Sequence, residues 1–93
     1  MNSFSTDEHS TLSILLKRFD HEKVIRLEDI CDRYFGLNYE TAKKQAKIKA
    51  LPMATFRLGN SQKQPLLINI SDLAHHIDKI TAEATEEWNK FQE

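Results

Sequence analysis

Apolar residues near the start of the chain recur at helical spacing and then give way to a β-branched run. One face of a helix over residues 10–19 carries Leu12, Leu15, Leu16 and Phe19. Ser10 or Thr11 can cap its start. Residues 24–27 (VIRL) follow a polar connection and are rich in β-branched side chains, so they predict a short strand.

Two further helical patterns lie within residues 27–49, broken at Gly36-Leu37-Asn38. The first covers residues 28–35 and the second residues 39–49. Gly36 permits a left-handed C-terminal cap, and Asn38 can accept hydrogen bonds from the free N–H groups of the second helix. The pattern predicts a helix-turn-helix, and the alternative is an αα-hairpin of any small helical domain.

Strand-like segments follow at residues 54–58 (ATFRL) and 65–70 (PLLINI). The polar segment GNSQKQ between them contains a turn-forming Gly59-Asn60 pair, so the sequence predicts a β-hairpin. A hairpin directly after a helix-turn-helix is the arrangement of a winged helix, with residues 56–70 as the wing. The alternative for the hairpin tip is a solvent-exposed turn without a partner.

The last helix is expected over residues 72–92, with Ser71 as its N-cap. Its apolar positions form one stripe of Leu73, Ile77, Ile80, Ala84, Trp88 and Phe91. The second half of this helix extends beyond what a small domain needs, so we expect a homodimer that pairs through Ile77, Ile80, Ala84, Trp88 and Phe91. The alternative is that the helix folds back against Leu12, Leu15 and Phe19.

The size of the chain limits it to one core. With 93 residues, 40% of them hydrophobic, we expect a single domain over residues 10–93 after a flexible leader at residues 1–9. The elements above give an α+β, mostly helical fold class. They describe a small winged helix-turn-helix with an N-terminal helix, a β-hairpin wing and a long C-terminal helix.

Charge is distributed unevenly along the chain, although the formal net charge is only -1. Residues 41–71 contain six basic residues and no acidic residue. The remainder of the sequence therefore carries a net charge of -7. A basic segment between acidic ends can attract an anionic backbone because charges beyond about 8 to 10 Å are largely screened. The alternative is that the lysines form a solvated helix face.

Membrane insertion, secretion and catalysis find little support in the sequence. No apolar run approaches the roughly 18 to 20 residues of a membrane span, and MNSFSTDEHS lacks the features of a secretion signal. Cys31, the single cysteine, is expected to be a buried apolar residue, and no Cys/His set has metal-binding spacing. No nucleophile and base pair is recognisable. We expect a cytoplasmic protein that is not an enzyme and takes no cofactor, metal or small-molecule substrate.

A set of short motifs within residues 25–78 resembles one protein family. Its most telling parts are Tyr34-Phe35-Gly36-Leu37, Leu51-Pro52, Phe56-Arg57-Leu58-Gly59, Ser61-Gln62-Lys63, Pro65 and Asp72-Leu73-Ala74 with Ile77-Asp78. They make the chain similar to the pyocin activator (PrtN) family, small bacterial and prophage regulators of phage-tail-like bacteriocin genes. The resemblance implies a transcriptional activator that binds promoter DNA of phage-related genes. The order of elements also resembles excisionase and MerR-type winged domains, which often have glycine where this chain has Ala50.

The winged helix-turn-helix interpretation gives each candidate residue a role. The helix over residues 39–49 would enter the major groove of double-stranded promoter DNA. Base contacts are expected from Tyr39, Glu40, Thr41, Lys43 and Lys44. Phosphate contacts are expected from Lys47, Lys49, Arg57 and Lys63, with Asn60, Ser61 and Gln62 at the wing tip and Gln62 suited to either role.

Two questions about partners stay open at this point. RNA polymerase is a candidate contact of the acidic tail or of a subunit interface. The competing hypothesis for the whole chain is a protein-interaction module of prophage origin, an antirepressor or adaptor, that uses the winged fold without DNA. The acidic tail with Trp88 and Phe91 is its main support.

Overall fold

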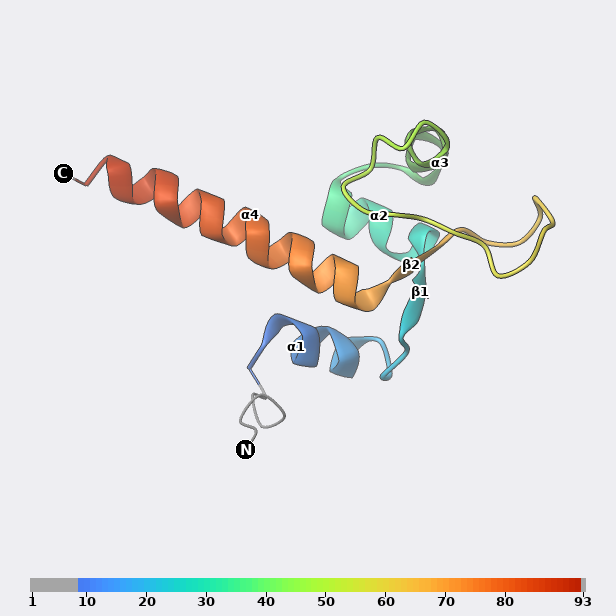
Figure 1. Cartoon of the computed structure of the whole chain (residues 1–93), viewed down its shortest axis with the longest axis horizontal. Helices are drawn as coiled ribbons and strands as arrows, with labels where there is room; N and C mark the ends of the chain where they lie inside the picture. Colours follow the sequence, from blue (N-terminus) through green and yellow to red (C-terminus); the bar gives the residue numbers. More distant parts are fainter. Residues whose placement is uncertain (1–8, 93) are drawn as a thin grey trace.

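The computed structural model describes residues 9–92 as four helices and one two-stranded antiparallel sheet (Figure 1). In chain order the elements are α1 (Thr11–Arg18), β1 (Val24–Arg26), α2 (Leu27–Phe35), α3 (Tyr39–Lys47), β2 (Leu67–Asn69) and α4 (Ile70–Lys90). They confirm the predicted α+β, mostly helical class. The leader predicted for residues 1–9 lies outside the described residues except for His9. Of the helices in residues 9–92, none has the length and apolar character needed to cross a bilayer.

The main core forms where α1, the sheet and the first half of α4 meet. The Ser10 side chain caps α1 by accepting a hydrogen bond from the Ser13 N–H at 3.1 Å, so Ser10 is the cap of the two candidates. α1 then runs alongside α4 in the opposite direction (Figure 1). Its contact face buries Leu15 in one cluster with Ile30, Ile68, Ile70 and Leu73. This burial of apolar surface fixes where α4 starts relative to the sheet.

The sheet pairs two segments far apart in the sequence. β1 and β2 are antiparallel, and Ile25 lies opposite Ile68 in the ladder. The predicted strand near residues 24–27 is thereby confirmed. Leu67 also bridges to Phe56 through two backbone hydrogen bonds of 2.8 and 3.0 Å. β2 therefore has an extended neighbour on either side.

The predicted hairpin of residues 54–58 and 65–70 is wrong in detail. Among the described residues, a single bridge between Phe56 and Leu67 joins the two segments, and residues 54–66 form a long loop. Pro65 has no N–H to donate to a ladder, and the Gln64 carbonyl is taken by the Arg57 side chain at 2.8 Å. Residue 70, assigned to the wing from the sequence, is already the first residue of α4.

The turn between α2 and α3 has the chemistry that the sequence predicts. Gly36 adopts a left-handed conformation at φ +67° and ends α2. The Asn38 side chain accepts a hydrogen bond from the Thr41 N–H at 2.8 Å and caps α3. α3 ends at Lys47 and not at residue 49, because Lys49 turns left-handed at φ +58°. The left-handed Lys49, directly before Ala50, therefore sets the direction in which the chain leaves α3.

A second cluster joins α2 to α3 and the segments that follow. It buries Leu27, Cys31, Ala42, Leu51 and Leu66. Burial raises the pKa of the Cys31 thiol, which keeps it protonated and apolar at neutral pH, as expected from the sequence. The cluster determines which face of α3 points inward and therefore which face is exposed to solvent.

α4 begins two residues earlier than predicted and has a different cap. The Asn69 side chain accepts from the Ser71 N–H at 2.9 Å, so Asn69 and not Ser71 is the N-cap. The Ile70 N–H bonds to the Lys23 carbonyl at 2.9 Å, which leads the chain directly from the sheet into the helix. The first half of α4 packs against the main core as far as Ile77. The second half does not fold back against Leu12, Leu15 and Phe19, so that alternative is wrong. From residue 78 to residue 92 every side chain is exposed.

Candidate nucleic-acid interface

α3 packs against α2 through a face that carries small side chains, and this contact sets its orientation. Ala42 is fully buried against the cluster of Leu27 and Cys31, and Ala46 and Tyr39 pack beside it. Positions on the opposite side of a helix then point to solvent. That outward face consists of Glu40, Lys44 and Lys47, all of them exposed.

The first turn of α3 contains a local charge pair. The Lys43 Nζ lies 3.5 Å from a Glu40 carboxylate oxygen and 5.3 Å from the centroid of the Tyr39 ring. Both interactions draw the Lys43 ammonium toward the start of the helix. Within residues 9–92, neither Lys44 nor Lys47 forms an ion pair. The two lysines are thus available to an external anion.

A groove lies between α3 and the loop of residues 54–66. It has a volume of about 480 Å³ and is lined by Lys43, Lys47, Lys49, Arg57 and Gln62, together with Ala46, Thr55, Phe56 and Leu66. None of these lining residues is acidic. We refer to it below as the basic groove.

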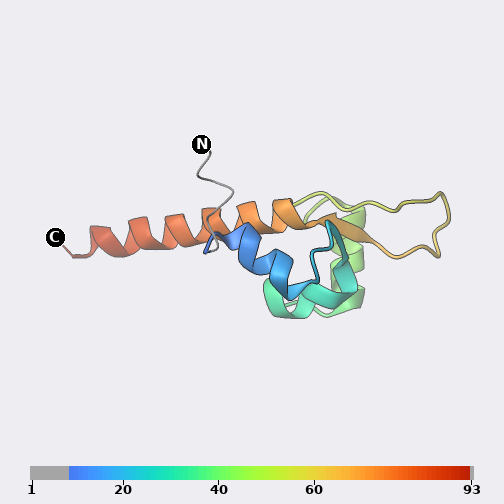
Figure 2. The same ribbon diagram turned by 90° about the horizontal axis from the view of Figure 1, so that it is seen from below.

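The loop owes its shape to a few contacts near its ends. At its base, Phe56 bridges to Leu67, and the Arg57 Nε donates to the Gln64 carbonyl at 2.8 Å. At its tip, the Ser61 hydroxyl accepts from the Lys63 N–H at 3.0 Å, and the Ser61 carbonyl accepts from the Gln64 N–H at 3.1 Å. The loop projects from the end of the molecule that also holds α3, opposite the C-terminus (Figure 2).

The candidate residues named from the sequence fall into three places. Five of them line the basic groove: Lys43, Lys47, Lys49, Arg57 and Gln62. Asn60, Ser61 and Lys63 are exposed at the loop tip, outside the groove. On α3, Glu40 and Lys44 are exposed outside the groove, whereas Tyr39 and Thr41 are half-buried in the first turn.

Sequence reasoning missed two features of this surface. Thr55 and Phe56 line the groove although neither carries a charge. A hydroxyl at position 55 is a donor that polar composition could have indicated. The Glu40 and Lys43 pair was also missed, and its i, i+3 spacing is a signal that the sequence does contain.

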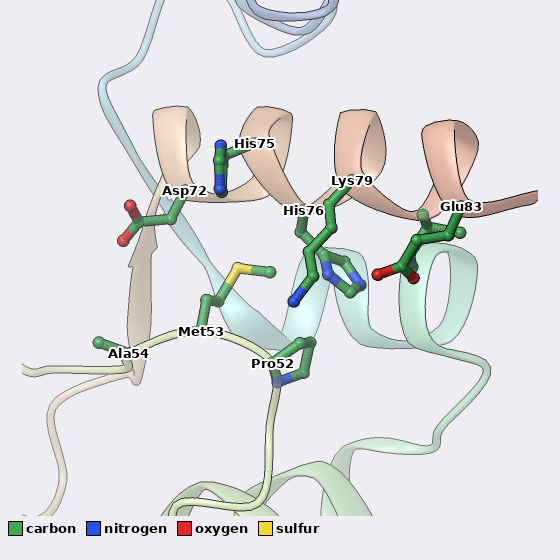
Figure 3. Close-up of a pocket in the computed structure, with 9 residues that line it drawn as sticks. Pro52, Met53, Ala54, Asp72, His75, His76, Lys79 and Glu83 are labelled. Atoms are coloured by element: carbon green, nitrogen blue, oxygen red, sulfur yellow. The ribbon is translucent and has the colours of Figure 1, made fainter. Parts of the chain in front are cut away.

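A second hollow lies between α4 and the segment after α3 (Figure 3). Its walls include Asp72, His75 and Glu83 from α4 and Met53 from the facing segment. His76 also lines it, with its ring packed edge-on to Phe35 at 6.1 Å between centroids. The described residues contain no group of three or more His, Cys, Asp or Glu placed to hold a metal ion. The mixed charges of this hollow contrast with the single sign of the basic groove.

The residues assigned to a dimer lie along α4. Ile77 is half-buried against the main core, and Ala84 is exposed. Ile80, Trp88 and Phe91 are 50%, 62% and 83% exposed. Among the described residues, none covers the stripe beyond Ile77.

Comparison with known proteins assigns the chain to a family. The family model described as pyocin activator protein PrtN matches residues 11–84, a wider stretch than residues 25–78 in which the resemblance was recognised. No curated protein and no solved structure matches the chain. The family implies a regulatory protein, a transcriptional activator of pyocin genes. Because the match covers α1 to α3, the loop and most of α4, the chain belongs to the pyocin activator protein PrtN family.

Proposed function

We propose that this chain activates pyocin genes by binding their promoter DNA through α3 and the loop of residues 54–66. The observation that carries the proposal is the basic groove, whose lining includes four cationic side chains and, among the described residues, no acidic one. A phosphate backbone is the ligand whose charge and linear shape suit such a groove.

The near-neutral net charge does not argue against this partner. The acidic residues Glu83, Glu86 and Glu87 belong to the half of α4 that extends away from the basic groove (Figure 1). Fixed charges separated by more than about 8 to 10 Å are largely screened at physiological ionic strength. The groove therefore presents a local positive potential to an approaching duplex.

The outward face of α3 is the surface we assign to base reading. Lys44 can donate to guanine O6 and N7, and Glu40 can accept from cytosine N4. Lys43, which the sequence placed among the base readers, lines the groove and pairs with Glu40, so we assign it to phosphate. Tyr39 and Thr41 are half-buried and stand at the margin of this surface.

The extended segments around β2 support a winged arrangement. β2 pairs with β1 on one side and bridges to Phe56 on the other, and the loop leaves from this small sheet. We propose that the loop is the wing. Its tip offers Asn60, Ser61 and Lys63, which are hydrogen-bond donors without negative charge and suit the adjacent backbone.

Activation also requires contact with the transcription machinery. We assign that contact to the acidic half of α4, with RNA polymerase as the partner. Replacing Glu83 and Glu86 by glutamine is expected to lower transcription from a pyocin promoter severalfold while promoter affinity stays unchanged. A reporter assay beside a gel shift measures both, and unchanged transcription would contradict the assignment.

An adaptor that does not bind DNA is the competing function, favoured by the exposure of Trp88 and Phe91. Competition binding separates the two functions. The full chain is titrated onto a labelled pyocin promoter fragment in the presence of unlabelled promoter or random duplex. We expect promoter DNA to compete at least about a hundredfold better, within the usual range of specificity ratios. Equal competition by both duplexes would contradict the proposal.

Matched lysine variants locate the binding surface in the same assay. Lys47→Ala removes one charge from the groove and is expected to weaken promoter binding about tenfold. Lys90→Ala removes the same charge at the far end of α4 and is the control, expected to bind as the parent protein does. An equal loss in both variants would show that overall charge, and not the groove, governs binding.

A further inference from the structure

We propose that residues 77–91, the second part of α4 with its C-cap Phe91, pair antiparallel with the same segment of a second copy of this chain, forming a dimer with two-fold symmetry. The segment carries the stripe of Ile77, Ile80, Ala84, Trp88 and Phe91. We call it the α4 stripe.

The α4 stripe continues the face by which α4 enters the core. Leu73 on the same face is fully buried against α1, and Ile77 packs beside it. Beyond Ile77, α1 no longer lies alongside α4, and the same face becomes exposed, up to 83% at Phe91. Soluble monomers rarely leave a contiguous row of large apolar groups in water, so this face has the character of an interface.

The order of side chains makes the stripe complementary to itself. In an antiparallel pair centred on Ala84, the two Ala84 side chains meet and let the helices approach closely. Trp88 of each copy then lies opposite Ile80 of the other, and Phe91 lies opposite Ile77. Each large ring thus faces an aliphatic group, and every contact of one residue with another is repeated in reverse, as a two-fold interface requires.

A parallel pair would pack less well. It would place Trp88 against Trp88 and Phe91 against Phe91 at one end and the smaller Ile77 and Ile80 pairs at the other. The large rings would hold the helices apart at their end, and interiors are packed closely, so the uneven spacing forfeits contacts. The antiparallel order is the arrangement that fills the interface evenly.

A partner helix packed on the α4 stripe would continue the line of α1, which packs against the first half of the same face of α4. α1 runs antiparallel to α4, and its first residue, Thr11, donates a hydrogen bond to Asp78, where the exposed part of α4 begins. The second copy's α4 would run in the same direction as α1 and end there. Its Phe91 would reach Leu12, which is still 37% exposed although it lies on the core face of α1.

The surface area buried between the two copies places this dimer among weak interfaces. Aromatic side chains bury on the order of 150–250 Å² each, so two copies of this stripe bury on the order of 1,000 Å² in total. That lies at the lower end for a specific interface. Lys79 and Glu86 fall on the opposite face of the helix, Glu83 and Lys90 fall on its flank, and all four stay in water. We therefore expect a dimer that dissociates on dilution into the micromolar range.

Sedimentation equilibrium of the full chain without DNA tests the pairing. The weight-average mass should rise from 10.8 kDa toward twice that value as concentration increases from about 1 to 200 µM, spanning the micromolar affinities of weak interfaces. Trp88→Gln with Phe91→Gln should stay at the monomer mass, and Lys79→Gln with Lys90→Gln should dimerise as the parent does. A parent chain that stays monomeric leaves the stripe to another protein and overturns the proposal. A dimer that persists in the Trp88 and Phe91 variant overturns the assigned interface.

Two spectroscopic measurements on folded protein complete the test. Trp88 is the sole tryptophan, so its emission should shift to shorter wavelength as concentration rises, and a constant emission would count against burial of this residue. Spin labels on Gln92→Cys should lie roughly 25 Å apart in the antiparallel dimer, from 1.5 Å of rise per residue. A separation of about 10 Å, the spacing of adjacent helices, would instead show a parallel pair and overturn the proposed orientation.

Discussion

Lys49 closes α3 from a left-handed conformation by donating its backbone N–H to the Ala46 carbonyl at 3.1 Å. The following N–H, of Ala50, bonds to the Gln45 carbonyl at 2.8 Å, which completes a Schellman-type cap. A non-glycine residue in this conformation is strained by roughly 1–2 kcal/mol. Because the Lys49 side chain also lines the basic groove, one position combines a strained cap with a charge used for binding.

Lys49→Gly is therefore expected to change stability and DNA affinity in opposite directions. Glycine relieves the left-handed strain, so the free energy of unfolding should rise by about 1 kcal/mol. That gain corresponds to roughly 4–8 °C in Tm for a domain of this size. Loss of the charge should weaken duplex binding about tenfold. Thermal unfolding and duplex titration measure the two effects.

Lys47→Gly is the matched control for this variant. It removes an equal charge from the groove, but Lys47 is the last residue of α3 and has no left-handed strain to relieve, so glycine should lower the free energy of unfolding, by at most about 1 kcal/mol. If both variants lose stability alike, the left-handed cap is not strained as we infer.

Asn38→Ala is expected to destabilise the protein without touching the basic groove. It removes the acceptor for the Thr41 N–H, and loss of an N-cap costs about 1 kcal/mol. Asn38→Asp retains the acceptor and should unfold close to the parent. Chemical denaturation checks the pair, with Asn60→Ala in the exposed loop as a neutral control. Equal midpoints for Asn38→Ala and Asn60→Ala would exclude a capping role.

Glu40→Gln should strengthen binding to random duplex by about three- to tenfold, the effect of roughly one additional phosphate contact. The change removes a negative charge next to the groove and releases Lys43 from its ion pair at 3.5 Å. If Glu40 also reads a cytosine, the preference for promoter over random DNA should shrink at the same time. Competition titrations report both quantities. Weaker binding to random duplex would contradict the electrostatic role of Glu40.

Lys44→Ala and Lys63→Ala should have different consequences for sequence preference. Lys44 is on the outward face of α3, so its loss should change which sequences bind best, at a cost of about 1–3 kcal/mol at one base position. Lys63 is at the loop tip, and its loss should weaken all duplexes alike. Selection from a randomised duplex pool distinguishes them. The reverse pattern would show that the two roles are interchanged.

Local chemistry explains which parts of the fold could be predicted from the sequence. Gly36 and Asn38 act within one turn of their own position, so the junction of α2 and α3 follows from the sequence alone. The hairpin does not, because a strand pairs with whichever edge the tertiary fold presents to it. Here β2 pairs with β1, far earlier in the chain, and keeps one bridge to Phe56.

In the candidate site, too, some features have a local signal in the sequence and others depend on the tertiary fold. The individual basic residues are evident from composition, and five of the candidates line one groove. That they meet depends on the loop turning back toward α3, which the Phe56 to Leu67 bridge and the Arg57 to Gln64 hydrogen bond secure. Such contacts across the loop have no local signal. The start of α4 is similar, since the Ile70 to Lys23 hydrogen bond of the sheet favours Asn69 over Ser71 as its cap.

The salt dependence of promoter binding tests whether the basic groove holds a phosphate backbone. With about five phosphates neutralised, a plot of log affinity against log salt concentration should have a slope near -4 to -5. Lys47→Ala should make that slope shallower by about 0.9, the value for one phosphate contact, while Lys90→Ala leaves it unchanged. A binding constant that is indifferent to salt would contradict DNA binding through this groove.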